Sequence, residues 1–296
     1  MCSDQVGQVG LSDVRRILQA WLAAAGDSLR KKRIVDADIH DARKLIKKSR
    51  AALRLLRAGV GEVSYCRENG ALRDAAQPLG LARDSKVLIA ALDALLERFA
   101  PAAHSLQLDK FRSVLRKERV TARQAITLAL VREQIKTLRE VSARGERWRL
   151  RGESWSVLGG GLEKIYRSGK KKMRAAARSR DDAQLHDWRK QVKYLWYQLQ
   201  ILASVQPAPI EAWVEQACRL ADLLGDDHDL AVLRAKIAAN AAVFKAYDQD
   251  ALIAILDRRR NQLQAKALKL GARLYEEKPR RFVARVAKHW RQRHAE

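Results

Sequence analysis

A short pattern of residues occurs twice, about half a chain length apart, and it restricts the possible folds more than any other feature. The first copy reads Ile39-His40-Asp41-Ala42-Arg43-Lys44, and the second reads Leu185-His186-Asp187-Trp188-Arg189-Lys190. A second landmark follows each copy, as Leu79-Gly80 and Leu224-Gly225. The histidines are 146 positions apart and the glycines 145. Landmarks that keep their order and spacing indicate a duplicated unit of about 145 residues.

Apolar residues recur at helical spacing along almost the whole chain, and the period-two alternation of strands is absent. The chain has only five prolines, and Ala, Leu, Arg and Lys are its common residues. These features predict an all-α fold. The expected helices lie at roughly 11–31, 36–58, 63–79, 84–99, 104–118, 120–144, 158–178, 182–204, 209–224, 229–246 and 248–274, with a short one from 279.

Glycine and aspartate suggest where several of these helices begin and end. Gly80 and Gly225 fit helix C-termini, and Asp84 and Asp229 would then cap the helices that follow. The repeated Leu-Gly landmark therefore predicts a helix break at the same place in each half.

Asp36 and Asp182 precede the two histidines by four residues, and each is a suitable cap for the helix that carries the histidine. The glycine-rich segment 144–161 is the expected connection between the halves. One domain built of two repeats, at about 10–145 and about 157–296, is the predicted organisation.

The charge of the chain predicts an anionic partner. It carries 59 Lys and Arg against 34 Asp and Glu, a formal net charge of +25. This excess repels itself in a compact protein, so nucleic acid, an acidic membrane surface or polyphosphate is the expected partner. A basic surface that is merely solvated is the alternative.

The chain shows no sign of secretion or membrane insertion. Its first ten residues lack the pattern of a secretory signal, and no apolar run approaches the ~20 residues of a membrane span. The three scattered cysteines, Cys2, Cys66 and Cys218, do not suggest a disulfide framework. A reducing cytoplasm is therefore the expected location.

Helical geometry places the cations of each copy on one side of its helix. On a helix that advances about 100° per residue, Arg43, Lys47, Arg50 and Arg54 lie within about 80° of His40 on one side, and Lys44 lies about 40° away on the other. Lys48 belongs to the same run of cations. In the second copy a single face is shared by His186, Arg189, Lys190 and Lys193. Apolar residues take the opposite arc in both helices. A basic face that occurs twice predicts two halves closing on one anionic ligand.

Two further groups of cations recur at helical spacing. They are Arg112 with Arg116, and Arg167 with Lys170, Lys171 and Arg174. Each group alone is typical of a solvated face. In a helical bundle, however, several such faces can converge on one cleft, and we include them in the predicted binding surface.

These landmarks, with Leu224-Gly225-Asp226-Asp227-His228-Asp229-Leu230, make the chain resemble the CHAD family, the conserved histidine α-helical domain, over nearly its whole length. The resemblance implies two pseudo-symmetric four-helix bundles of long antiparallel helices around a basic groove or pore. It also implies binding of inorganic polyphosphate, association with polyphosphate granules and polyphosphate-metabolising enzymes as partners. By position, the channel would be lined by His40, Arg43, Lys44, Lys47, Lys48, Arg50, His186, Arg189, Lys190 and Lys193.

The chain departs from the family pattern where Tyr194 and Trp196 replace cations in the second copy. This departure predicts unequal ligand contacts, with the ligand shifted toward the first half.

Two other functions compete with a passive polyphosphate binder. A metal-dependent phosphohydrolase could use His228 and Asp229 with His40 and His186 as ligands, but Arg83 replaces His228 in the first half and cannot ligate a metal. Nucleic-acid binding suits the charge, although no nucleic-acid-binding motif is present, so nucleic acid is expected only as a non-specific polyanion. No nucleophile constellation and no phosphate-cradling loop stand out. We therefore expect no catalysis, no metal and no cofactor.

Overall fold

The computed structural model describes residues 9–103, 106–205 and 210–291, and every long element in these ranges is a helix. An all-α fold is therefore confirmed. In chain order the helices are α1 (Val9–Leu29), α2 (Asp36–Leu55), α3 (Arg57–Val60), α4 (Glu62–Ala76), α5 (Pro78–Arg98), α6 (Ala100–Ala103), α7 (Asp109–Gln124), α8 (Leu128–Glu146), α9 (Ser154–Ser179), α10 (Asp182–Val205), α11 (Glu211–Ala239), the 3-10 helix η1 (Ala241–Val243), α12 (Ala246–Leu274) and α13 (Pro279–Arg291).

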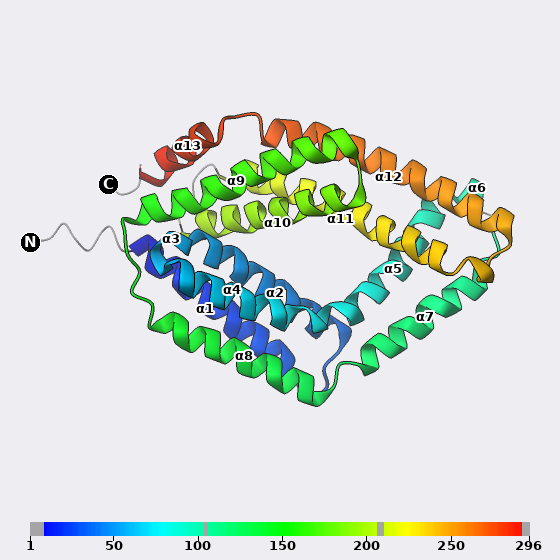
Figure 1. Ribbon diagram of the computed structural model, residues 1–296, viewed down its shortest axis with the longest axis horizontal. Coiled ribbons are helices and arrows are strands. Elements are labelled where there is room, and N and C mark those ends of the chain that lie inside the picture. The colour runs from blue at the N-terminus through cyan, green and yellow to red at the C-terminus, as the bar shows by residue number, and fades with distance from the viewer. Residues whose placement is uncertain (1–8, 104–105, 206–209, 292–296) are drawn as a thin grey trace, which may run out of the picture.

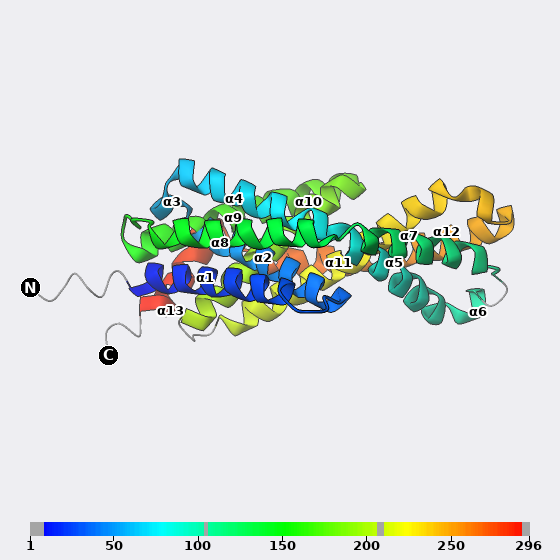
Figure 2. The same ribbon diagram turned by 90° about the horizontal axis from the view of Figure 1, so that it is seen from below.

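The long helices form two groups that lie side by side (Figure 1). Helices α1, α2, α4 and α8 pack on one another, and α9, α10, α11 and α12 form the second group. The groups meet mainly where α2 packs against α10, so the two copies of the repeated pattern lie on neighbouring helices. Helices α5 and α7 extend, with the far parts of α11 and α12, at the end opposite the chain termini (Figure 2). A pseudo-twofold relation between the groups stays a prediction.

The apolar arcs of α2 and α10 form the core, as the helical geometry predicts. Ala42 and Ile46 on α2 and Trp188 and Val192 on α10 have no exposed surface. Burying a side chain of the size of Ile46 or Val192 stabilises the fold by roughly 1.5–3 kcal/mol. Because these arcs face inward, the opposite arcs of the same two helices must present their cations elsewhere. No helix among the described residues is long and apolar enough to cross a bilayer.

The predicted helix break at Gly225 is wrong, and the break in the first half lies at Gln77, three residues before Gly80. Helix α5 starts at Pro78 and runs through Gly80, and α11 runs through Gly225, so Asp84 and Asp229 lie inside helices and not at helix starts. Each glycine sits beside an arginine side chain, as described below, but only at Gly80 does the missing Cβ make room for that side chain. Gly80 therefore reflects tertiary packing rather than chain termination.

The predicted connection is also shorter than expected. It spans only residues 147–153, and the run Gly159-Gly160-Gly161 lies inside α9. A Cβ on Gly161 would lie 2.8 Å from the Cα and carbonyl oxygen of Leu55. The glycine thus allows α9 to approach the backbone of α2. In the first half, the helix predicted from residue 104 begins at Asp109. Residues 104–105 lie outside the described ranges.

Asp36 and Asp182 do not cap their helices as predicted. Asp36 forms an ion pair with Arg119 of α7 at 2.8 Å, and Asp182 pairs with Arg260 of α12. The backbone donors at the two helix starts are satisfied by neighbouring acids instead. Asp38 accepts from the amide of Val35 at 2.8 Å, and Asp181 accepts from the amide of Gln184 at 2.8 Å. Long-range pairing with arginine outcompeted the local cap.

Both described cysteines, Cys66 and Cys218, are free thiols, whereas Cys2 lies outside the described residues.

Candidate polyanion-binding groove

A cavity of about 250 Å³ opens where α2, α5, α10 and α11 meet, and we call it the groove. Its walls carry many more positive than negative side chains. They are Arg43, Lys47, Arg50, Leu88, His186, Arg189, Lys190, Lys193, Tyr194, Tyr197, His228, Asp229 and Val232. Three Lys and Arg residues come from each copy of the repeated pattern. The two basic faces predicted from the sequence therefore meet in one place.

Each copy places its arginine beside its own repeated glycine. Arg43 packs on Gly80, where an added Cβ would lie 1.8 Å from the arginine Nη1, and it donates a hydrogen bond to the carbonyl of Ala76 at 3.4 Å. Arg189 lies beside Gly225, where an added Cβ would be 3.9 Å from its Nε. The repeated arginine and the repeated glycine are thus neighbours in both halves. Close packing on Gly80 and the hydrogen bond to Ala76 fix the Arg43 guanidinium in the groove wall, and Arg189 is only 7% exposed.

Asn69 of α4 orients two more arginines of α2. Its side-chain oxygen accepts from Arg50 at 3.2 Å and from Arg54 at 3.0 Å. Arg54 stacks 3.9 Å from the ring centre of Tyr194, so it holds this tyrosine in the groove wall without lining the groove itself. Burial is the main cause that lowers the pKa of the Arg50 guanidinium, which still stays charged at neutral pH.

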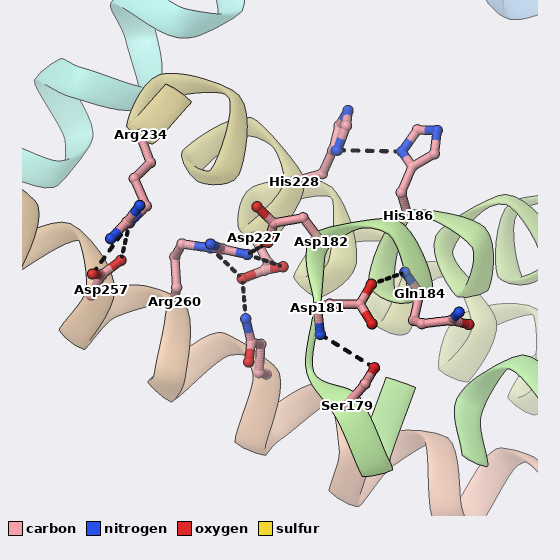
Figure 3. Close-up of polar contacts among 11 residues, drawn as sticks. Ser179, Asp181, Asp182, Gln184, His186, Asp227, His228, Arg234, Asp257 and Arg260 are labelled. Atoms are coloured by element: carbon pink, nitrogen blue, oxygen red, sulfur yellow. Dashed lines mark hydrogen bonds and ion pairs between the residues drawn. The ribbon is translucent and has the colours of Figure 1, made fainter. Parts of the chain in front are cut away.

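A pair of histidines faces each other across the groove. The Nδ1 atoms of His186 and His228 are 3.3 Å apart, and Figure 3 shows the two rings turned toward one another. Such a contact needs one ring to donate and the other to accept, so at least one ring must be neutral. Burial, followed by the charges of Lys190 and Arg189, lowers the pKa of His186.

The aspartate that follows His186 organises the rim of the groove. Asp187 bridges Lys172 of α9, at 2.7 Å, and Lys190, at 2.6 Å. The hydrogen bond from Lys172 is the largest of the causes that lower the pKa of Asp187 to about 2. The carboxylate therefore stays charged at physiological pH and keeps Lys190 beside the groove.

Several predicted ligand residues lie outside the groove, and four of them contact other side chains or backbone carbonyls of the protein. Lys48 is half-buried over the rings of Trp21 and Tyr197, and Lys170 donates to the carbonyls of Glu276 and Glu277. Arg112 pairs with Asp93, and Arg167 pairs with Glu163. The remaining ones are His40, which is half-buried, and the exposed Lys44, Arg116, Lys171 and Arg174.

Sequence reasoning missed the contribution of α11 to the groove. His228, Asp229 and Val232 line it, but a helix start at Asp229 separated them from one another in the prediction. A helix that continues through Gly225 brings these residues onto one side, since positions three and four apart are neighbours. A helix predicted to continue through Gly225 would have placed these three residues in the groove.

The acidic run 226–229 does not act as one unit. Asp227 turns to Arg260, whereas His228 faces His186 on the other side of α11 (Figure 3). Among the described residues, no three His, Cys, Asp or Glu side chains are placed to share a metal ion.

Comparison with known proteins agrees with this fold. The CHAD domain model matches residues 13–238, and the chain belongs to the CHAD family. PptA from Streptomyces chartreusis is similar in structure, with a TM-score of 0.66 and 14% identity over 90% of this chain and 99% of PptA. The CHAD domain from the plant Ricinus communis has a TM-score of 0.55 and 17% identity over 90% of this chain and 91% of that domain. At these identities the two structures show the fold alone. No curated protein matches the chain.

Proposed function

We propose that the groove binds inorganic polyphosphate and that the protein acts by binding, without catalysis. The observation that carries this proposal is the meeting of six Lys and Arg residues, three from α2 and three from α10, in one groove. Membership of the CHAD family supports it further.

The chemistry of the groove suits a chain of phosphates. Polyphosphate offers no base edges, so a binder needs charge density along a path. Arg43 and Arg189 are held in place and present forked donors to phosphate oxygens, whereas Lys47 and Lys193 supply more mobile charges. Fixed donors lower the ordering cost of binding. In the cell, such a protein would associate with polyphosphate granules and recruit enzymes of polyphosphate metabolism to them.

Titration with long-chain polyphosphate at several salt concentrations tests this proposal, with charge-matched DNA and added chelator as comparisons. Six phosphate contacts predict a slope of about −4 in log affinity against log salt, using the single-strand value. We expect preferential binding of polyphosphate, insensitivity to chelator and an intact ligand. Equal affinity for DNA would reduce the function to general polyanion binding, and metal-dependent release of phosphate would establish a hydrolase.

A single methyl group on Gly80 is expected to weaken this binding. In Gly80→Ala the new Cβ displaces the Arg43 guanidinium, and the loss of one charged contact lowers affinity about tenfold. Gly225→Ala is the matched control, because its Cβ meets Arg189 at an ordinary contact distance. The control should keep its affinity and, as a helix-interior Gly→Ala change, gain up to about 1 kcal/mol of stability. Equal affinities of the two variants would show that Arg43 does not contact the ligand.

Polyphosphate binding is expected to strengthen as pH falls. The groups that face His186 are Asp187, Arg189 and Lys190 on its own helix, Lys47 of α2 and His228 of α11. Burial and these cations lower the pKa of His186 in the free protein, and a bound polyanion would raise its pKa again. Binding then takes up a proton.

Affinity should therefore rise by up to about tenfold between roughly pH 8 and pH 5.5, the range in which histidine titrates. Asp187 stays ionised throughout this range, because its pKa is about 2. Titrations at constant ionic strength measure the effect. His186→Gln should flatten the profile, and an unchanged profile in this variant would assign the pH dependence to other groups.

A further inference from the structure

A second basic hollow lies at the opposite end of α4 from the groove. Arg43 of the groove reaches Ala76 at the C-terminal end of α4, whereas this hollow surrounds the N-terminal end of that helix. Its volume is about 630 Å³. The lining residues are Ala58, Gly59, Val60, Gly61, Ser64, Arg67, Arg144, Arg147, Trp148, Arg149 and Arg151. We call it the arginine pocket. It shares no lining residue with the groove.

The charge of the arginine pocket is of one sign. Five arginines line it, and its described lining contains no aspartate or glutamate. Nearby acids are already engaged, since Glu62 binds Arg57 and Glu140 lies 3.8 Å from Arg144. Guanidinium groups that outnumber the acids paired with them repel one another, and a multiply charged anion offsets that repulsion.

A buried glutamate holds two of the five arginines. Glu68 has no exposed surface, accepts hydrogen bonds from Arg144 at 2.8, 3.0 and 3.1 Å, and pairs with Arg67 at 2.8 Å. One carboxylate thus orients two guanidinium groups, and Arg147, Arg149 and Arg151 add three further positive charges to the same hollow. Buried acids that hold arginines in this way fix the donors before a ligand arrives.

The segment that supplies the other three arginines is tied down on both sides. Arg15 of α1 donates to the carbonyl of Trp148 at 3.3 Å, and the amide of Arg151 donates to the carbonyl of Gly59 at 3.1 Å. A Cβ on Gly59 would lie 3.2 Å from the carbonyl oxygen of Arg151, so the contact with α3 is close. The arginines of residues 147–151 therefore project from an anchored backbone.

We infer that the arginine pocket is a second anion site, which takes a compact oligophosphate of about three phosphate groups. Planar guanidinium groups match phosphate oxygens with paired hydrogen bonds, and several of them around one hollow favour an anion with several phosphates over a single carboxylate. Gly61 and Ser64 at the start of α4 add the positive end of a helix to the same wall. The ligand is either a free short oligophosphate or the end of a long polyphosphate chain.

Calorimetric titration with tripolyphosphate tests the site. The variant Arg147→Gln, Arg149→Gln, Arg151→Gln removes three charges from the arginine pocket but leaves the backbone hydrogen bonds of the segment in place. The variant Lys266→Gln, Lys269→Gln, Arg273→Gln removes three charges from exposed positions of α12 and is the matched control. Circular dichroism and thermal unfolding verify that both variants fold.

Two tripolyphosphate sites are expected in the parent protein, and one in the pocket variant. A third variant, with the groove residues Lys47, Lys190 and Lys193 changed to Gln, should keep the pocket site. The failure of the groove proposal and the failure of this one are thereby separable. If the pocket variant binds tripolyphosphate with the stoichiometry and affinity of the α12 control, the arginine pocket is a solvated surface and the inference is wrong.

Long-chain polyphosphate separates the two sources of the ligand. A pocket that receives the end of a groove-bound chain predicts that the pocket variant loses affinity for long chains about tenfold or more, as for a second linked contact. A pocket for free oligophosphate predicts unchanged long-chain affinity with loss of tripolyphosphate binding. Both results support an anion site in the arginine pocket, and they distinguish the end of a long chain from a free oligophosphate as its ligand.

Discussion

Changing Lys47, Lys190 and Lys193 together to glutamine is expected to lower the affinity for long-chain polyphosphate by about 30- to 100-fold at low salt. The three lysines line the groove from both helices, so the variant weakens both copies of the basic face at once. Arg43 and Arg189 remain beside Gly80 and Gly225, and the walls of the groove keep their shape. The loss should come from charge alone.

The salt dependence gives a second readout of the same variant. Three lost phosphate contacts should reduce the slope of log affinity against log salt by about 2. The control is again Lys266→Gln, Lys269→Gln, Arg273→Gln on α12, which changes the net charge equally. Equal losses in the two variants would mean that the ligand responds to the overall charge of the protein and that the groove is not its site.

The sequence was sufficient to predict that α2 and α10 meet at their basic sides. In each helix the cations and the apolar residues take opposite arcs, so burying Ile46 and Val192 leaves the cations on the remaining faces. The repetition of the pattern then indicated one shared ligand. These inferences depend on the geometry of a single helix, which local sequence determines well.

Side-chain contacts between different helices could not be predicted from the geometry of a single helix. A helical wheel places Lys48 near the basic face, but Trp21 of α1 and Tyr197 of α10 draw its side chain into a cation–π contact. Glycine has low helix propensity, so Gly80 suggested a helix end. It lies inside α5 instead, where the Arg43 guanidinium occupies the space that a Cβ would fill. In both cases a neighbour distant in sequence decides the outcome.

The prediction that the ligand lies nearer the first half, made from Tyr194 and Trp196, also depends on which side chains pack around these aromatic residues. Tyr194 lines the groove with Arg54 stacked on it, so an aromatic position is still tied to a cation. Arg189, Lys190 and Lys193 of the second copy line the groove in the same number as the cations of the first. The groove therefore gives no preference for the first half.

The largest loss of stability is expected from Asp227→Ala. Asp227 is 2% exposed, accepts from Arg260 at 3.0 Å and from Gln264 at 2.9 Å, and lies at the centre of a network that includes Asp182 (Figure 3). Removing it leaves the buried Arg260 guanidinium with only the exposed Asp182 as a counter-charge and without its buried one. Breaking a buried pair in this way costs about 3–5 kcal/mol of unfolding free energy.

The same region provides an exposed ion pair as the matched control. Arg234 and Asp257 join α11 to α12 at 2.9 Å, as Asp227 and Arg260 do, but their side chains are 44% and 41% exposed. Asp257→Ala should therefore cost less than about 1 kcal/mol. Urea unfolding of both variants measures the difference. If Asp227→Ala cost no more than Asp257→Ala, the Asp227–Arg260 pair would be accessible to water in solution and would not hold α11 and α12 together.

A double replacement separates the cost of a stranded charge from the value of the network. Asp227→Leu with Arg260→Met removes both charges, and it should recover most of the stability that Asp227→Ala loses, since apolar pairs of similar volume often replace buried ion pairs without penalty. Its polyphosphate affinity should stay below that of the parent protein. The network joins Asp182, at the start of the helix that carries His186, to Asp227, the neighbour of His228. A stable double variant with full affinity would show that the network serves folding alone.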